Sequence, residues 1–205
     1  MAFVACDDPA PAPATAPEPD RPPPTEPPAP PQPPSLASIG MPTPGNARAI
    51  YPVWNEARSW FEHQTRDAPA RLGRSEDVTQ VLVGTDGTDG ILITFYGRDL
   101  ARGEYPVLPG TDETRRERAG RDDDVFTLVL TRPGVEDLRS LSGVVEILEL
   151  DDTVVGAADV DVRSAIHSID TPLRVRFHAA PDPRLDAALE QEAAIRDQFR
   201  RRHLR

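Results

Sequence analysis

The chain has 205 residues, and its 34 acidic side chains outnumber 23 basic ones, all of them arginine, for a formal net charge of −11. A surface of that sign repels the phosphate backbone, so we expect no nucleic-acid partner. The single cysteine excludes an internal disulfide framework and a cysteine-rich zinc site, and no apolar run of about 18 residues is present to cross a bilayer as a helix.

Residues 1–45 hold 16 of the 24 prolines and are predicted to form a disordered tether. Residues 9–34 alone contain 14 prolines, in runs such as Pro22-Pro23-Pro24. Proline fixes φ and lacks a backbone donor, which favours an extended polyproline-II spacer over a packed element. We expect this tether to make almost no contact with the rest of the chain.

Residues 46–66 carry both tryptophans. Pro52 suits the first turn of a helix, and Trp54 and Phe61 follow at helical spacing, which predicts a short helix over 52–65. The alternative is a strand over Ala47–Trp54, whose alternate residues would line one face. In either case we expect the aromatic side chains in the core.

Residues 77–181 alternate apolar and polar side chains in the manner of short strands separated by turns. The expected strands are Val78–Val83, Gly90–Gly97, Glu104–Leu108, Val125–Thr131, Gly143–Leu150, Thr153–Arg163 and Leu173–Ala179. A parallel sheet would need crossover helices, for which there is little room. The predicted fold class is therefore mostly β: an antiparallel β-sandwich or barrel of about seven strands over residues 46–181.

The last two expected strands should pair antiparallel through the loop 164–171. A register centred on that loop sets Asp161 opposite Arg174 and Asp159 opposite Arg176 on the outer face. The apolar alternation fixes this choice, because a one-residue slip would turn both arginines toward the core. On the inner face, Phe177 is expected opposite Ala158.

Residues 182–205 are predicted to form an amphipathic C-terminal helix. Asp182 is a good N-cap, and Pro183 fits the first helical position. The stripe expected to pack on the β domain consists of Leu185, Leu189, Ile195 and Phe199.

Catalytic and metal motifs are sparse. The sequence contains no HExxH, GxSxG or glycine-rich phosphate loop, so we assign no catalytic residue and expect no cofactor. Calcium binds loop carboxylates, but turn chemistry explains the clustered acids equally well, and they lack EF-hand spacing. The weak metal candidates are Asp86, Asp89, Asp122, Asp123 and Asp124.

The N-terminal residues Phe3-Val4-Ala5-Cys6 resemble the end of a bacterial lipoprotein signal peptide. In that family a large apolar residue lies three positions before a cysteine that becomes the lipidated first residue of the mature chain. The resemblance implies lipidation of Cys6. Only five residues precede Cys6, whereas an export signal needs a basic segment and a longer apolar one, so we expect the coding sequence to extend upstream of Met1.

The body is similar to small β-sandwich lipoproteins of GC-rich bacteria, in which a strand, a tight acidic turn and a second strand with a central glycine precede the last strand. Here these are Ser142–Leu150, Asp151-Asp152 and Thr153–Val162 with Gly156. The resemblance implies a non-enzymatic, lipid-anchored cell-envelope domain, periplasmic or at the surface, with a binding or structural role toward an unknown protein or glycan. The alternatives are a hydrolase-type enzyme that uses loop carboxylates and a soluble cytosolic interaction module.

Overall fold

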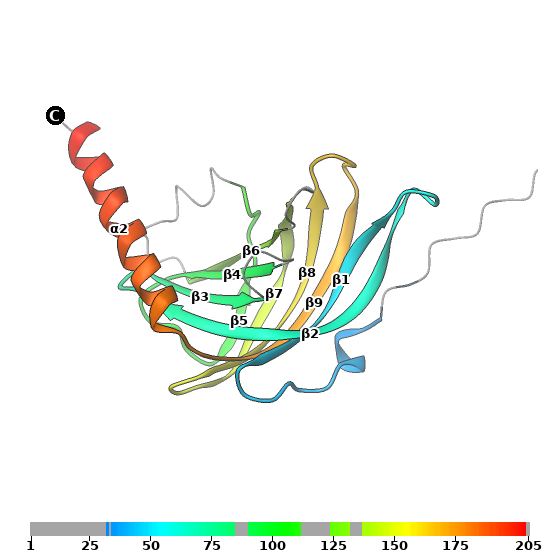
Figure 1. Cartoon of the computed structure of the whole chain (residues 1–205), viewed down its shortest axis with the longest axis horizontal. Coiled ribbons are helices and arrows are strands. Elements are labelled where there is room, and N and C mark those ends of the chain that lie inside the picture. The colour runs from blue at the N-terminus through cyan, green and yellow to red at the C-terminus, as the bar shows by residue number, and fades with distance from the viewer. Residues whose placement is uncertain (1–31, 33, 85–89, 112–123, 132–136, 204–205) are drawn as a thin grey trace, which may run out of the picture.

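A computed structural model describes residues 32, 34–84, 90–111, 124–131 and 137–203. In this part of the chain, eight antiparallel strands close into a barrel, a ninth strand lies beside it, and one α-helix follows at the C-terminus (Figure 1). The strands are β1 (Asn46–Asn55), β2 (Trp60–Arg74), β3 (Val78–Val83), β4 (Gly90–Tyr96), β5 (Gly103–Pro106), β6 (Val125–Thr131), β7 (Leu138–Leu150), β8 (Val154–Ser164) and β9 (Asp170–Pro181).

The strand order is an up-and-down meander. Around the barrel, β1, β2, β3, β4, β6, β7, β8 and β9 each pair with the next, and β9 pairs with β1 to close the ring. The β5 strand pairs with β7 outside this order. Of the two predicted architectures the barrel is therefore correct, with eight strands in the ring and one beside it in place of about seven.

The predicted helix over 52–65 is wrong, and the alternative strand is correct. These residues form β1 and the start of β2, joined as a hairpin in which Trp54 and Phe61 are cross-strand partners rather than members of one helical stripe. Ala47, Ala49 and Tyr51 alternate along β1 and belong to the buried core. This period of two outweighs the helical spacing of the two aromatic residues.

One continuous cluster of buried apolar side chains occupies the barrel interior, and its largest fully buried members are phenylalanine, leucine and isoleucine. The buried polar residues of the described chain are all uncharged: Gln80, Thr94, Thr127, Ser140, Ser164 and Thr171. Eight-stranded barrels have an interior just wide enough to be filled by side chains or to hold one small ligand. Apolar side chains occupy the interior of this barrel.

The β8 and β9 strands pair antiparallel as expected, with Arg174 and Arg176 on the outer face, but their register differs by two residues from the prediction. Asp159 lies opposite Arg174, and Arg163 lies opposite Asp170 next to the loop. A two-residue shift keeps every side chain on its predicted face, so the apolar alternation cannot detect it. The observed loop covers only residues 165–169, so it is shorter than the predicted loop of 164–171.

The same shift places Gly156, rather than Ala158, opposite Phe177. A Cβ atom at Gly156 would lie 2.6 Å from the Phe177 ring and 2.6 Å from the carbonyl oxygen of Glu146. Both atoms belong to the packed wall, so the central glycine of β8 makes room for the largest ring of β9.

The barrel wall parts between β6 and β7, which pair at only two positions, Val129–Arg139 and Leu130–Leu138. Here the β5 segment is inserted. The Val107 amide donates to the Gly143 carbonyl at 3.0 Å, and the Leu108 amide donates to the Phe126 carbonyl at 2.8 Å. Backbone hydrogen bonds therefore complete the wall at this junction.

The wall also parts between β1 and β9, which pair only from Asn46–His178 to Ile50–Arg174. If this register continued, Pro52 would lie opposite Pro172. Neither residue has an amide hydrogen, so two opposed prolines end the ladder. We call the unpaired stretch between residues 51–55 of β1 and residues 170–173 of β9 the β1–β9 seam.

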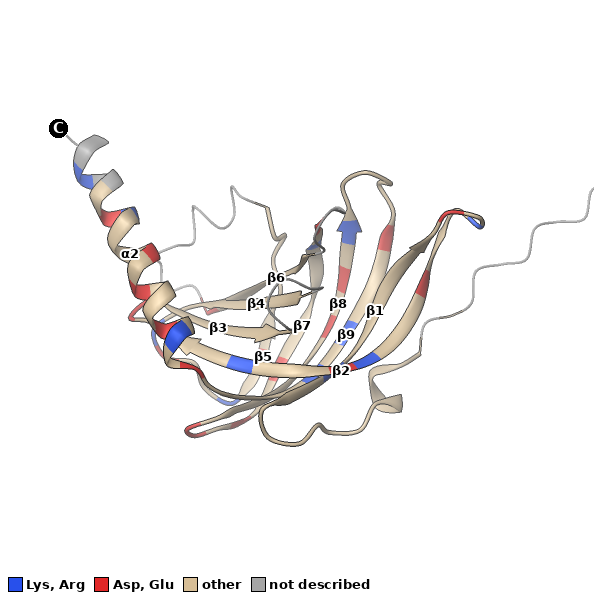
Figure 2. Cartoon of the chain, viewed as in Figure 1, with Lys and Arg blue, Asp and Glu red and all other residues tan. Residues whose placement is uncertain are grey.

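The C-terminal helix α2 (Pro183–His203) begins as predicted. The Asp182 carboxylate accepts a hydrogen bond from the Arg184 amide at 2.9 Å, as an N-cap does. The Asp186 carboxylate accepts a hydrogen bond from the Arg74 amide at 2.7 Å, which fastens the first turn to the end of β2. Charges of both signs then follow along the helix (Figure 2).

Only the start of the expected helix stripe packs as predicted. Leu189 is buried against Val78 and Tyr96, and Leu185 contacts Gly73. Ile195 is exposed, so its expected burial is wrong, because the helix projects away from the barrel beyond its first turns (Figure 1). Phe199 lies outside the described side chains.

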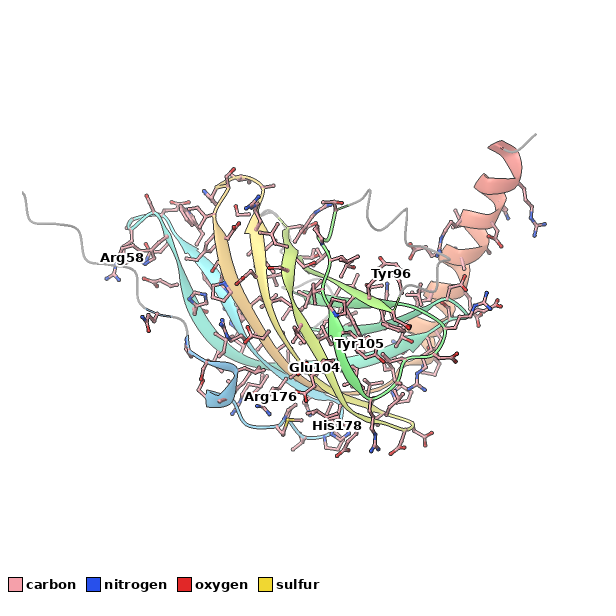
Figure 3. All side chains as sticks on the ribbon, turned by 180° about the vertical axis from the view of Figure 1, so that it is seen from behind. Arg58, Tyr96, Glu104, Tyr105, Arg176 and His178 are labelled. Carbon is pink, nitrogen blue, oxygen red and sulfur yellow. The ribbon has the colours of Figure 1, made fainter. Side chains whose placement is uncertain are left out.

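The end of the predicted tether packs on the barrel, contrary to the expectation for residues 1–45. Ile39 is buried, next to the 3-10 helix η1 (Leu36–Ser38). The Arg176 guanidinium of β9 donates to the Leu36 carbonyl at 3.3 Å, and Figure 3 shows Arg176 beside this segment. The remainder of the tether lies outside the described residues.

Replacing Gly156 by alanine should lower the free energy of unfolding by about 1–3 kcal/mol, because the added methyl group overpacks the wall against Phe177 and Glu146. Gly40→Ala is the matched control, since nothing lies within 4 Å of a Cβ at Gly40. Urea denaturation measures both. Equal stability of Gly156→Ala and the parent chain would contradict this packing.

Candidate binding surface at the hairpin tips

Two hairpin tips lie at the same end of the barrel. The β1–β2 hairpin turns at residues 56–59, and the β8–β9 hairpin turns at residues 165–169 (Figure 1). Because the β1–β9 seam lies between them, no backbone ladder joins the two hairpins at this end.

Aromatic stacking joins the hairpins across the seam. The Trp54 ring stacks on His167 with 3.8 Å between centroids and 15° between planes. Phe61 presents its edge to this pair, with its centroid 5.1 Å from that of Trp54. The Ser164 hydroxyl accepts a hydrogen bond from the His167 amide at 2.9 Å, which fixes the backbone of the loop at His167.

A second contact crosses the seam through His63. Its Nε2 atom lies 3.2 Å from the hydroxyl of Thr171, a buried residue of β9. Burial lowers the pKa of His63 below its ordinary value; the nearby Arg174 charge lowers it further, and a hydrogen bond with the Pro172 backbone opposes both effects. The neutral imidazole is thus the form that suits the seam.

The β8–β9 loop carries exposed apolar side chains. Ile166 is 70% exposed and Ile169 is 36% exposed, and residues 165–169 contain no Asp, Glu or Arg. Beside the loop, Arg163 and Asp170 form a bidentate ion pair with distances of 2.6 and 2.8 Å. The loop is therefore an apolar knob whose flanking charges neutralise each other.

The β1–β2 tip places Trp60 beside paired charges. The Arg58 guanidinium lies 5.6 Å from the centre of the Trp60 ring and 3.4 Å from the Glu62 carboxylate, which also accepts a hydrogen bond from Asn55. Figure 3 labels Arg58 at this tip. We define the tip surface as Trp54, Trp60, Phe61, Ile166, His167 and Ile169.

The residues singled out from the sequence lie elsewhere. Cys6, Asp86, Asp89, Asp122 and Asp123 are outside the described residues. Asp124 is described, as an exposed residue with φ of 49° that precedes β6. Across the described ranges, no three His, Cys, Asp or Glu side chains gather as a metal site, and no helix is long and apolar enough to span a membrane.

Sequence reasoning missed the tip surface because it assigned all the aromatic side chains to the core. Phe61 is buried as expected, but Trp54 and Trp60 are only partly covered. The signal that was available is the loop 165–169, an uncharged segment with two isoleucines between charged strand ends. Its proximity to the tryptophans depends on barrel closure, which joins segments more than 100 residues apart.

Comparison with known proteins identifies no relative: no family model matches the chain, and neither the curated proteins nor the solved structures yield a significant match.

The lowered pKa of His63 predicts acid sensitivity of the fold. As the pH falls below the ordinary histidine pKa of about 6.5, the unfolded chain binds a proton at this residue before the folded chain does, so stability is lost. His63→Gln keeps a hydrogen-bonding group and removes the titration. Urea denaturation between about pH 7 and pH 5 should show a shallower loss of stability in the variant; identical slopes would refute the assignment.

Proposed function

We propose that this chain is a non-enzymatic, lipid-anchored domain of the cell envelope that binds another envelope component through its tip surface. The observation that carries the proposal is the exposed Ile166, in a loop that the stacked Trp54 and His167 rings join to the β1–β2 hairpin. Exposed apolar groups on a fixed support are typical of interaction sites. The N-terminal resemblance supports the anchor at Cys6, and the proline-rich segment supports its use as a spacer.

Two carboxyl groups on the outer wall lack the electrostatics of a general acid. A carboxyl group that acts as a general acid needs a raised pKa. The pKa values of Asp67 and Asp170 are instead lowered, by hydrogen bonds from Arg48 and Arg163. Both pairs lie exposed on the outer wall, where they serve as cross-strand contacts. The hydrolase alternative would therefore depend on other carboxylates.

Lipidation is tested by expressing the gene with its upstream sequence in its native host in the presence of radiolabelled palmitate. The label should appear in the parent protein and disappear in Cys6→Ser, because that thiol is the acceptor. A label that persists in Cys6→Ser would refute Cys6 as the acceptor, and an unlabelled parent protein would favour the cytosolic alternative.

Binding is tested by co-sedimentation of the purified Cys6→Ser chain with envelope fragments from the host. Ile166→Ser should weaken this binding roughly tenfold, the loss expected for one buried isoleucine. Ile195→Ser is the matched control, since Ile195 is 47% exposed on α2, away from the tips, and should leave binding unchanged. Equal effects of both substitutions would exclude the tip surface.

A further inference from the structure

We propose that the envelope component contacted by the tip surface is the lipid bilayer itself, at the boundary between headgroups and acyl chains. This inference rests on the proposed function, because it names the partner of the same surface. It follows from the distribution of apolar, aromatic and charged groups at the two tips.

The outermost apolar groups suit insertion into lipid. Ile166 has the largest exposed fraction among the large apolar side chains of the described chain, and Ile169 lies in the same uncharged loop. The nearest charges on either side, Arg163 and Asp170, already neutralise each other. An uncharged loop can enter the interface without the cost of desolvating an isolated ion.

The aromatic side chains lie behind the isoleucine knob. Trp54 and Trp60 are partly exposed at the bases of the tips, and Arg58 beside Trp60 is paired with Glu62. Indole rings concentrate at the headgroup level of membranes, although the Trp60 Nε1 atom is buried and this ring can offer only its apolar part. An apolar knob with tryptophans behind it is the order of groups that an interfacial contact requires.

Charge selects the kind of membrane. The chain has a net charge of −11, and Glu56 adds an acid to the β1–β2 tip with no ion-pair partner among the described residues. An anionic surface would repel the domain, so zwitterionic lipid is the expected partner.

The tether permits this contact. Cys6 and Pro34 are 28 positions apart, which in polyproline-II geometry corresponds to on the order of 90 Å at about 3.1 Å per residue. A lipid on Cys6 would hold the domain near the bilayer at high effective concentration, so a weak insertion of the tips suffices for a stable orientation.

The two tryptophans of the chain both belong to the tip surface, which allows a direct test. The full chain carrying Cys6→Ser is mixed with vesicles of phosphatidylcholine whose acyl chains are brominated near the headgroup. Bromine quenches indole emission only at close range. We expect quenching and a blue shift, a fall of at least about tenfold in vesicle affinity for Ile166→Ser/Ile169→Ser, and no change for Ile195→Ser.

Replacing about a third of the phosphatidylcholine by an anionic lipid should weaken the binding. The proposal would be overturned if the vesicles left the tryptophan emission unchanged, or if they quenched it equally in the double variant. If co-sedimentation with envelope fragments depends on Ile166 but brominated lipid does not quench the emission, the proposed function stands and the partner of the tip surface is a protein or glycan. Near-ultraviolet circular dichroism confirms that each variant is folded.

Discussion

The opposition of Pro52 and Pro172 determines how far the barrel closes. On one side of these prolines, residues 46–50 of β1 pair with residues 174–178 of β9. These five pairs turn a meander of strands into a ring around an apolar core. On the other side, neither proline can donate the next hydrogen bond of the ladder, and the β1–β2 and β8–β9 hairpins separate. The ring is closed by the pairing of residues 46–50 with 174–178, and the separation beyond it follows from the two prolines.

The two incomplete junctions of the wall are sealed in different ways. Between β6 and β7 a further strand is inserted, so backbone hydrogen bonds complete the wall and the region is fixed. In the β1–β9 seam, side chains replace the ladder: the Trp54–His167 stack and the His63–Thr171 contact hold the tips together. Aromatic groups that would otherwise be core are therefore brought to the rim, where they border solvent.

This arrangement links stability and function. The stack that crosses the seam includes His167, the residue next to the exposed Ile166, so a ligand or a membrane that contacts Ile166 lies beside the junction between two hairpins. Protonation of His63 acts on the same junction from the inner side. The tip surface is thereby coupled to the barrel wall rather than appended to it.

Much of the strand content could be predicted from local pattern. The β9 strand follows strict apolar alternation, whereas β3, β4, β6 and β8 are short runs rich in apolar residues, and the cap of α2 follows from Asp182 and Pro183. By contrast, β2 has a run of exposed polar residues from Gln64 to Asp67 and a proline at position 69, so no period marks it as a strand.

The missing parts of the prediction are those that depend on distant segments. The two-residue shift of β8 against β9 preserves both faces and depends on the loop geometry. The tip surface requires residues 54–61 and 166–169 to meet, which only the closure of the ring brings about. Ile195 fits the helical period, but the helix leaves the barrel before that residue reaches a partner.

The closure and its interruption are tested most directly by interstrand nuclear Overhauser effects between β1 and β9. Cross-peaks are expected between residues 46–50 and 174–178 and not between the backbones of residues 51–55 and 170–173, and the series should extend when Pro52 and Pro172 are both replaced by alanine. Absence of the first set would mean an open sheet. A series that continues past Pro52 in the parent chain would contradict the role assigned to the prolines.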